Sequence, residues 1–217
     1  AAEIVFPNTV PPFFPTGALI TYPPTNRPDY ERRLEGVRTH NRWLKDWCAA
    51  HPERRCGLPQ VFLFDLDDTT VDSSHRTQLN ADGSINLTHW RKHCTAEMIA
   101  RDGVLPLADK MIEGIADGLD IVILTSRVMG RADLAWLKRH GMIAPTILSR
   151  SVADDRPTGQ YKLARLHELA IDRRMSFVDL VKSVIMWDDC KNVQSVLQNA
   201  GVRVIDPVQY NLNQKEA

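Results

Sequence analysis

Short, continuous runs of apolar residues recur through the chain and alternate with segments of helical periodicity. The apolar runs cover residues 61–64, 121–124, 146–148, 184–187 and, as a final short strand, 201–206. Strands that are covered on both faces of a parallel sheet have this continuous apolar character. The helical segments lie between the runs, at residues 107–116, 131–139, 161–170 and 192–200. This alternation predicts an α/β fold built on a doubly wound parallel sheet.

The first 57 residues have a different pattern. Seven of the 13 prolines stand at positions 7, 11, 12, 15, 23, 24 and 28, and proline removes an amide donor and fixes φ, which excludes regular helix and central strand. Large apolar side chains between these prolines predict an extended arm that packs on the body or on a neighbouring subunit, and so could build a homo-oligomer. Apolar positions at near-helical spacing over residues 29–50 predict an amphipathic helix. We therefore divide the chain into an N-terminal arm plus helix (1–57), one folded domain (58–210) and a C-terminal frayed tail (211–217).

Charge and cysteine content exclude several classes of protein. Lysine plus arginine and aspartate plus glutamate both number 27, so a zero net charge gives no global argument for a nucleic-acid coat or a membrane-surface protein, although a local basic groove is compatible with it. No apolar run approaches the roughly 20 residues that span a bilayer, and the first residues lack the regions of a secretory signal. Removal of an initiator methionine and truncation would both explain the start at Ala1. Four cysteines without CxxC spacing are too sparse for a disulfide scaffold, which predicts a cytoplasmic protein.

The strongest chemical signal directly follows the first apolar run. The chain there reads Asp65, Leu66, Asp67, Asp68, Thr69. Alternation at a strand end directs Asp65 and Asp67 to the same side, and open α/β sheets bind ligands at the carboxyl ends of their strands. Acidic residues in this place can also form turns or cap helices, so the motif alone leaves both interpretations open.

Three further features stand where a phosphoryl-transfer site would need them. They are a hydroxyl-rich strand end, a lysine that opens a helix and a second strand-terminal acidic pair, namely Thr125-Ser126-Arg127, Lys162 and Asp188-Asp189. An attacking carboxylate forms a covalent aspartyl-phosphate, and a second acid protonates the leaving group and then activates water. Crowded carboxylates beside a phosphate require a hard divalent cation, and oxygen ligands favour Mg²⁺. Hydroxyl and ammonium groups would hold the non-bridging phosphate oxygens.

These four motifs, in this order, resemble the signature of the haloacid dehalogenase (HAD) superfamily. The resemblance implies a HAD-like, Rossmannoid fold and a phosphatase in which Asp65 is the nucleophile and Asp67 the general acid/base. It implies that Thr125 and Lys162 complete the catalytic set. It also implies a Mg²⁺ site formed by Asp65, the backbone carbonyl of Asp67, Asp188 and, through water, Asp189.

The interval between residues 72 and 120 indicates which branch of the superfamily the chain resembles. It is too short for a large inserted domain, which predicts a small or minimal cap and open access to the site. Residues 60–206 resemble the phosphatase domain of phage-type polynucleotide kinase-phosphatases, but no GxxxxGK(S/T) loop occurs, so a kinase half is absent. This likeness implies substrate-binding residues that grip phosphate or polynucleotide backbone, namely Arg76, Ser126, Arg127, Arg150 and Arg156. The planar guanidinium of arginine binds phosphate well, yet each of these arginines could also be an ordinary surface residue. For Arg150 and Arg156 the two interpretations have equal support.

Other polar and aromatic residues carry weaker signals. Asp68 stands where the family usually has glycine, and Cys190 stands where it commonly has an arginine that could orient the acids. His89 and His93 could share a helical face, but surface or core histidines are a better interpretation than a zinc site. Tryptophans such as Trp90 could stack a base, although the core is the more common place for them.

Three functions remain after these arguments. The leading prediction is removal of 3′-phosphates from nucleic-acid ends, and the alternative is a 5′- or 3′-nucleotidase or another small-molecule phosphatase. A second alternative is a non-catalytic structural or binding protein on a HAD fold. The intact set of Asp65, Asp67, Lys162 and Asp188 argues against the last of these. The sequence does not identify the phosphorylated substrate, because loop geometry sets specificity.

Overall fold

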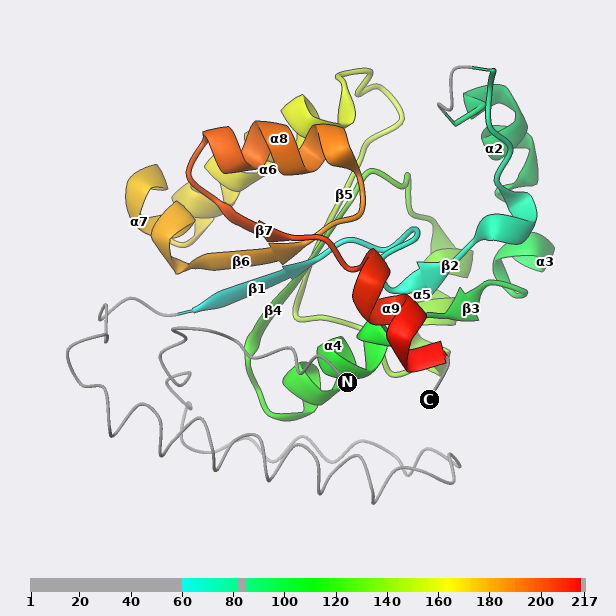
Figure 1. The fold of residues 1–217 in the computed structure, drawn as a ribbon, viewed down its shortest axis with the longest axis horizontal. Helices are drawn as coiled ribbons and strands as arrows, with labels where there is room; N and C mark the ends of the chain where they lie inside the picture. The colour runs from blue at the N-terminus through cyan, green and yellow to red at the C-terminus, as the bar shows by residue number, and fades with distance from the viewer. Residues whose placement is uncertain (1–59, 82–84, 216–217) are drawn as a thin grey trace.

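The computed structural model describes residues 60–81 and 85–215, which form a parallel sheet with helices on both faces (Figure 1). The sheet has the order β5-β4-β1-β6-β7. Its strands are β1 (Val61–Phe64), β4 (Asp120–Thr125), β5 (Thr146–Ser149), β6 (Val184–Trp187) and β7 (Arg203–Ile205). The predicted α/β fold and its parallel sheet are therefore confirmed. The predicted arm, the amphipathic helix and the boundary after residue 57 lie outside the described residues.

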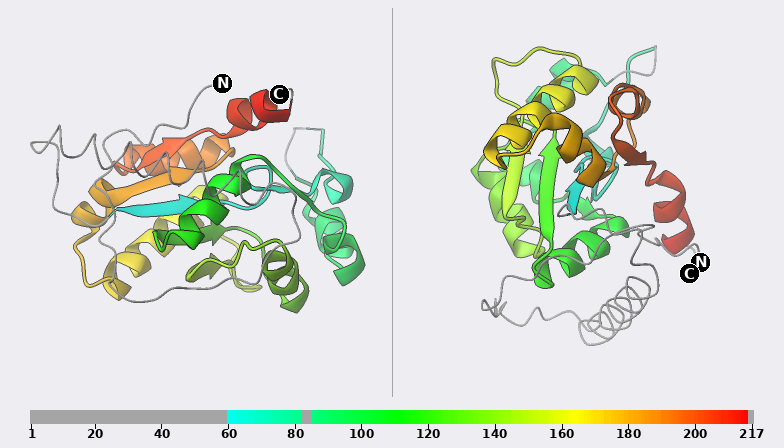
Figure 2. Two further views of the ribbon diagram at one scale, coloured as in Figure 1. Left: turned by 90° about the horizontal axis from the view of Figure 1, so that it is seen from below. Right: turned by 90° about the vertical axis from the view of Figure 1, so that its left-hand side faces the viewer.

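Two hydrophobic cores hold the helices against opposite faces of the sheet. Alternate residues of β1 point to opposite sides, so Phe62 and Phe64 join one core while Val61 and Leu63 join the other. The first core contains α4 (Leu107–Ala116) and α5 (Arg131–Arg139). The second contains α6 (Thr158–Asp172), α7 (Phe177–Ser183) and α8 (Lys191–Asn199). Figure 1 shows α6 and α8 above the sheet and α4 below it, and Figure 2 gives two further views of these layers.

A group of short elements connects β1 to α4. These elements are β2 (Val71–Asp72), η2 (Ser74–Arg76), α2 (Leu87–His93), α3 (Ala96–Ile99) and β3 (Gly103–Val104). Strands β2 and β3 pair antiparallel as a small second sheet. In Figure 1 this group lies beside the end toward which the β1 arrow points. The described part of the interval thus contains a small cap rather than a large inserted domain.

The C-terminal segment is folded, and the expectation of a frayed tail from residue 211 is wrong as far as residue 215. Helix α9 spans Val208–Lys215. Asn211 is 6% exposed, its Oδ1 accepts a hydrogen bond from the Leu107 amide at 2.9 Å, and its Nδ2 donates to the Thr69 carbonyl at 2.9 Å. The Leu107 amide is one of the first in α4, which no intrahelical carbonyl can satisfy. A side chain distant in sequence therefore caps α4 and holds the end of the chain.

The described residues also bear on the predictions about membrane-spanning segments and cysteines. Within residues 60–81 and 85–215, no helix has both the length and the apolar character that crossing a membrane requires. Cys94 and Cys190 are free thiols, while Cys48 and Cys56 belong to the part that the structure does not describe.

Candidate active site

The register of three neighbouring strands brings the sequence motifs to one edge of the sheet. Phe64 of β1 lies level with Trp187 of β6 and with Ile123 of β4. Asp65 therefore leaves the sheet beside Asp188, and its amide donates to the Trp187 carbonyl at 3.0 Å. Thr125, at the end of β4, follows on the other side of β1. Parallel strands end at the same edge, so residues more than 120 positions apart become neighbours.

Three carboxylates and one ammonium group form the centre of the site. Ligand oxygens of Asp65, Asp188 and Asp189 all lie within 4.8 Å of one another. Lys162 Nζ lies 2.8 Å from Asp65 Oδ1 and 2.6 Å from Asp188 Oδ2. Lys162 is 1% exposed and Asp188 is fully buried. We name Asp65, Lys162, Asp188 and Asp189 the acidic cluster.

Close packing of two helices places the lysine. Gly159, three residues before Lys162 on α6, lies against α8, where an added Cβ would come within 2.8 Å of Asn192 Oδ1 and Val196 Cγ2. The Gly159 amide also donates to Asn192 Oδ1 at 3.1 Å. Residues three apart share a helix face. The missing side chain at Gly159 therefore lets α6 approach α8 closely at the turn that carries Lys162.

Hydrogen bonds from one backbone amide and two side chains orient the second acidic pair. Asp188 Oδ1 accepts a hydrogen bond from the Cys190 amide at 3.0 Å, and the Asp188 carbonyl accepts one from Gln194 Nε2 at 2.8 Å. Asp189 Oδ1 accepts from Thr69 Oγ1 at 3.2 Å. The arginine that the family commonly has at position 190 is thus not needed to hold Asp188, because a backbone amide is present whatever the side chain.

Burial controls the ionisation of the cluster. Burial raises the pKa of Asp65 to about 7, against the opposing attraction of Lys162. Burial and the neighbouring Asp65 and Asp68 raise the pKa of Asp189 to about 7. Burial alone would lower the pKa of Lys162, but the attraction of Asp65 and Asp188 outweighs it and raises that pKa. The ammonium group stays charged, and it can neutralise only one of the three carboxylates once all three are ionised.

The donor set fits a hard divalent cation. Carboxylate oxygens are the ligands that Mg²⁺ prefers, and one lysine leaves two negative charges of the three acids uncompensated when all are ionised. Asp65, Asp188 and Asp189 are the expected metal residues that the structure brings together. The side chain of Asp67 points elsewhere, so its expected contribution through the backbone carbonyl stays a prediction.

A tight turn carries the motif away from β1. The Leu66 carbonyl accepts hydrogen bonds from the amides of Thr69, Thr70 and Val71 at 3.2, 2.9 and 2.8 Å. Asp68 within this turn has φ +58°, a left-handed conformation that aspartate, asparagine and glycine adopt more readily than other residues. This conformation explains why Asp68 can replace the usual glycine.

Asp68→Val should lower the free energy of unfolding by about 1–2 kcal/mol, because a β-branched residue is strained at positive φ. Asp68→Asn is the matched control, since it also removes the charge but tolerates the conformation. Urea denaturation of both variants measures the difference. Equal stability of the two variants would contradict the backbone explanation, because Asp68 is exposed and its side chain has little packing to lose.

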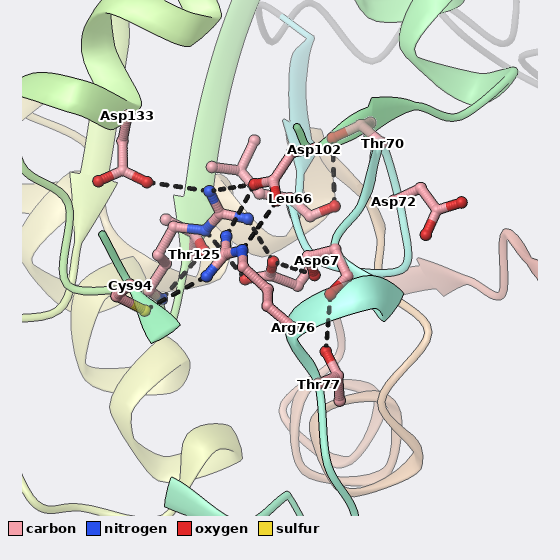
Figure 3. Close-up of polar contacts among 12 residues, drawn as sticks. Leu66, Asp67, Thr70, Asp72, Arg76, Thr77, Cys94, Asp102, Thr125 and Asp133 are labelled. Carbon is pink, nitrogen blue, oxygen red and sulfur yellow. Dashed lines mark hydrogen bonds and ion pairs between the residues drawn. The ribbon is translucent and has the colours of Figure 1, made fainter. Parts of the chain in front are cut away.

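Two side chains hold the carboxylate of Asp67, which is not a member of the acidic cluster; Figure 3 shows polar contacts around Asp67. Ser73 Oγ donates to Asp67 Oδ1 at 2.8 Å, Arg127 Nε donates to Oδ2 at 3.2 Å, and Arg127 Nη2 donates to Oδ1. Burial alone would raise the pKa of Asp67, but the charge and hydrogen bonds of Arg127 and the bond from Ser73 lower it. The two carboxylates of the motif thus lie in contrasting environments, because burial favours the neutral form of Asp65 whereas Arg127 favours the ionised form of Asp67.

The two arginines expected to grip a polynucleotide are turned inward. Arg76 is 1% exposed, and its Nε and Nη2 donate to Asp102 at 2.8 and 2.7 Å while its Nη1 approaches Cys94 Sγ at 3.2 Å. Arg127 is 5% exposed and binds Asp67. Neither guanidinium presents an exposed face to a passing backbone phosphate. This placement argues against contact with a neighbouring backbone phosphate, while contact of Arg76 or Arg127 with the reacting phosphate stays a prediction.

The remaining expected substrate residues lie in the loops that follow β4 and β5. Arg150 stacks over the Tyr161 ring at 4.4 Å, and it donates to the Asp154 carbonyl at 3.1 Å, the Arg156 carbonyl at 2.6 Å and Ser126 Oγ at 3.5 Å. Arg150 therefore braces this loop. The Arg156 side chain is 45% exposed and pairs with Asp154. Substrate contact by Ser126 or Arg156 stays a prediction.

Several aromatic and histidine side chains that could have had a function contact other groups of the protein. Trp136 is buried and donates to the Asp102 carbonyl at 3.2 Å. The Trp90 ring lies under the Arg76 guanidinium, 4.2 Å from its centroid. His89 and His93 stack on one face of α2 at 3.9 Å. The carboxylates Asp102 and Asp133, which sequence reasoning did not select, surround Arg127.

Comparisons with known proteins found relatives in sequence and in fold. The Escherichia phage T5 protein described as "5′-deoxynucleotidase" is 28% identical over 89 residues, which cover 39% of this chain and 36% of that protein's length. A HAD-like hydrolase from Streptococcus pneumoniae superposes with a TM-score of 0.50 at 14% identity, over 68% of this chain and 83% of that chain, and shows the same fold. A chain of the Pnkp1/Rnl/Hen1 RNA repair complex gives a TM-score of 0.45 at 18% identity, over 70% of this chain and 43% of that chain. The family model described as "Bacteriophage T5 5'-deoxynucleotidase" matches residues 53–215, well over half of the chain, so this protein belongs to that family and has a HAD-like fold.

Proposed function

We propose that the protein is a Mg²⁺-dependent phosphomonoesterase that releases phosphate from nucleoside monophosphates through an aspartyl-phosphate on Asp65. The observation that carries the proposal is the acidic cluster, in which a buried lysine lies 2.8 Å from Asp65 Oδ1 beside a second acidic pair. A carboxylate nucleophile requires such neighbours, because the phosphate dianion would otherwise be repelled. Family membership supports nucleotides as the class of substrate.

The residues divide the reaction into two displacements. The ionised Asp65 carboxylate attacks phosphorus, and the bond from phosphorus to the ester oxygen breaks while the protonated form of Asp67 gives that oxygen its proton and becomes a carboxylate. Asp67 then removes a proton from water, whose oxygen attacks phosphorus and releases inorganic phosphate from Asp65. Lys162 and Thr125 would hold the non-bridging oxygens. Mg²⁺ on Asp65, Asp188 and Asp189 would neutralise charge on the phosphate.

A free mononucleotide suits the described surroundings of the site better than a polynucleotide does. A polynucleotide presents phosphates beyond the reacting one, and recognition of these needs exposed cationic groups. Arg76 and Arg127 are buried and paired inside the protein. Arg156, by contrast, is exposed, and it lies in the loop that Arg150 links to Ser126. Because an exposed arginine can bind a further phosphate, Arg156 favours a second candidate function, the removal of 3′-phosphates from nucleic-acid ends.

A substrate panel tests both candidates. With Mg²⁺, the 5′-monophosphates of deoxynucleosides should be hydrolysed faster than 3′-monophosphates, 3′-phosphorylated oligonucleotides or sugar phosphates, and EDTA should stop each reaction. Arg156→Ala should leave mononucleotide hydrolysis within about twofold of wild type, because an exposed arginine paired with Asp154 has no part in the chemistry.

Two outcomes would revise the proposal in different ways. Preference for 3′-phosphorylated oligonucleotides, with a salt-dependent loss in Arg156→Ala, would establish the second candidate in place of the first. Release of phosphate from no member of the panel, at any Mg²⁺ concentration, would refute the phosphomonoesterase itself.

A further inference from the structure

Asp67, whose side chain is 23% exposed, belongs to a network of five charged side chains whose other members are buried (Figure 3). The other members are Arg127, Asp102, Asp133 and Arg76. Arg127 Nε and Nη2 donate to Asp67, while its Nη1 donates to Asp102 Oδ2 at 3.2 Å and to Asp133 Oδ1 at 2.9 Å. Every nitrogen of this guanidinium thus has a carboxylate partner, and the plane of the group is fixed by its contacts on both sides.

Asp102 joins this network to the small cap. It lies between α3 and β3 with a fully buried side chain. The Arg76 guanidinium donates to both of its oxygens, at 2.8 and 2.7 Å, and this two-point geometry fixes the carboxylate more firmly than a single hydrogen bond does. Its backbone carbonyl accepts from Trp136 Nε1 at 3.2 Å. Both the side chain and the backbone of Asp102 are therefore held from separate elements.

Asp133 fixes Arg127 from the opposite side. One of its oxygens accepts from Arg127, and the other accepts from the Gly130 amide at 2.8 Å, at the N-terminus of α5. This position makes Asp133 part of a helix cap. The Arg127 guanidinium is therefore held between a carboxylate of α5 and a carboxylate of the small cap, with Asp67 as its third partner.

We propose that Asp102 is a positioning residue, which acts through Arg127 to hold Asp67 where it exchanges a proton with the leaving oxygen and with water. The proposal rests on the phosphomonoesterase function proposed above. A carboxylate held by two hydrogen bonds from one guanidinium takes the orientation of that guanidinium. Arg127 in turn keeps its orientation only while the carboxylates behind it stay in place. Arg127 is accordingly a positioning residue and not a ligand of the substrate phosphate.

A comparison of substrates with different leaving groups distinguishes a positioning role of Asp102 from a merely structural one. An alkoxide leaving group, as in a nucleotide, needs a proton from Asp67, whereas p-nitrophenolate is stable enough to leave without one. The ratio kcat/KM reports steps up to formation of the phosphoenzyme. Misplacement of Asp67 should therefore lower kcat/KM for the nucleotide much more than for p-nitrophenyl phosphate. Partial unfolding would lower kcat/KM for both substrates by the same factor. The ratio of the two kcat/KM values is therefore independent of unfolding.

Asp102→Asn in the full chain with Mg²⁺ is the first variant to test. General acid catalysis contributes about 10²–10⁴-fold, so a displaced acid should lower kcat/KM for a deoxynucleoside 5′-monophosphate by about 10–100-fold. The value for p-nitrophenyl phosphate should stay within about threefold of wild type. Asp102→Glu and Arg127→Lys, which keep the charge but change its geometry, should shift the ratio in the same direction and serve if Asp102→Asn does not fold.

The double variant with Asp67→Asn provides the decisive control. Once residue 67 cannot transfer a proton, its position no longer matters, so Asp102→Asn should cause no further loss on that background. Equal losses for both substrates, or a full additional loss in the double variant, would overturn the positioning role. Wild-type protein that hydrolyses neither substrate would instead refute the proposed function, which keeps the two failures distinct.

Discussion

Asp65→Asn should reduce phosphate release from every substrate by on the order of 10⁴-fold or more, because loss of a nucleophile removes the covalent route. The amide keeps the size and shape of the side chain, so the fold should remain. Acid quenching of the wild-type reaction should trap phosphate on Asp65, and the variant should trap none. Steady-state phosphate release and mass spectrometry of the quenched protein measure both effects.

Asp120→Asn is a matched control for this prediction. Asp120 lies at the start of β4, at the opposite edge of the sheet, where it pairs with Arg173 at 2.6 Å. Its loss should leave turnover near the wild-type value, since surface ion pairs contribute little. Turnover of Asp65→Asn within a few-fold of wild type, after contaminating phosphatase has been excluded, would show that the nucleophile is another group.

Without Mg²⁺, the protein should become less stable as pH rises from about 4 to about 8. Asp65 and Asp189 have pKa values raised from 3.8 to about 7, so the folded state binds more protons than the unfolded state between these values. Stability therefore falls as pH rises through this window. The lowered pKa of Asp67 has the opposite effect on stability, because it stabilises the folded state at higher pH. This stabilisation is lost only below about pH 4.

Thermal melting with and without metal measures this dependence. We expect Tm in EDTA to fall by about 5 °C or more between pH 5 and pH 8, and Mg²⁺ to reverse most of the fall at pH 8, because it binds the ionised acids of the folded state. Asp65→Asn should make Tm depend less on pH, since it removes one of the two carboxyl groups whose pKa is raised. A Tm in EDTA that rises steadily to pH 8 would contradict the electrostatics of the acidic cluster.

Local patterns were sufficient to predict the sheet and the centre of the site. Continuous apolar runs identify buried parallel strands whatever the rest of the chain does, and β1, β4, β5, β6 and β7 all overlap the predicted ranges. Parallel strands end at one edge, so motifs that follow three such strands have to meet there. This topological rule explains why the Asp65, Thr125 and Asp188 motifs could be assigned to one site from their order along the chain.

The surroundings of Asp67 depended on contacts that leave no local pattern. The sequence does not show whether an arginine is buried in a network or exposed on the surface. Only the side chains that surround it in the folded protein distinguish the two cases. Asp102 resembles an ordinary turn residue, and Asp133 resembles a helix cap, which it also is. Asn211 stands in a polar segment that resembles a frayed tail until its contacts with Leu107 and Thr69 are seen. Hydrophobic periodicity is a property of neighbours in sequence and therefore specifies strands and helices, whereas the pairing of buried charges is a property of neighbours in space and required the tertiary structure.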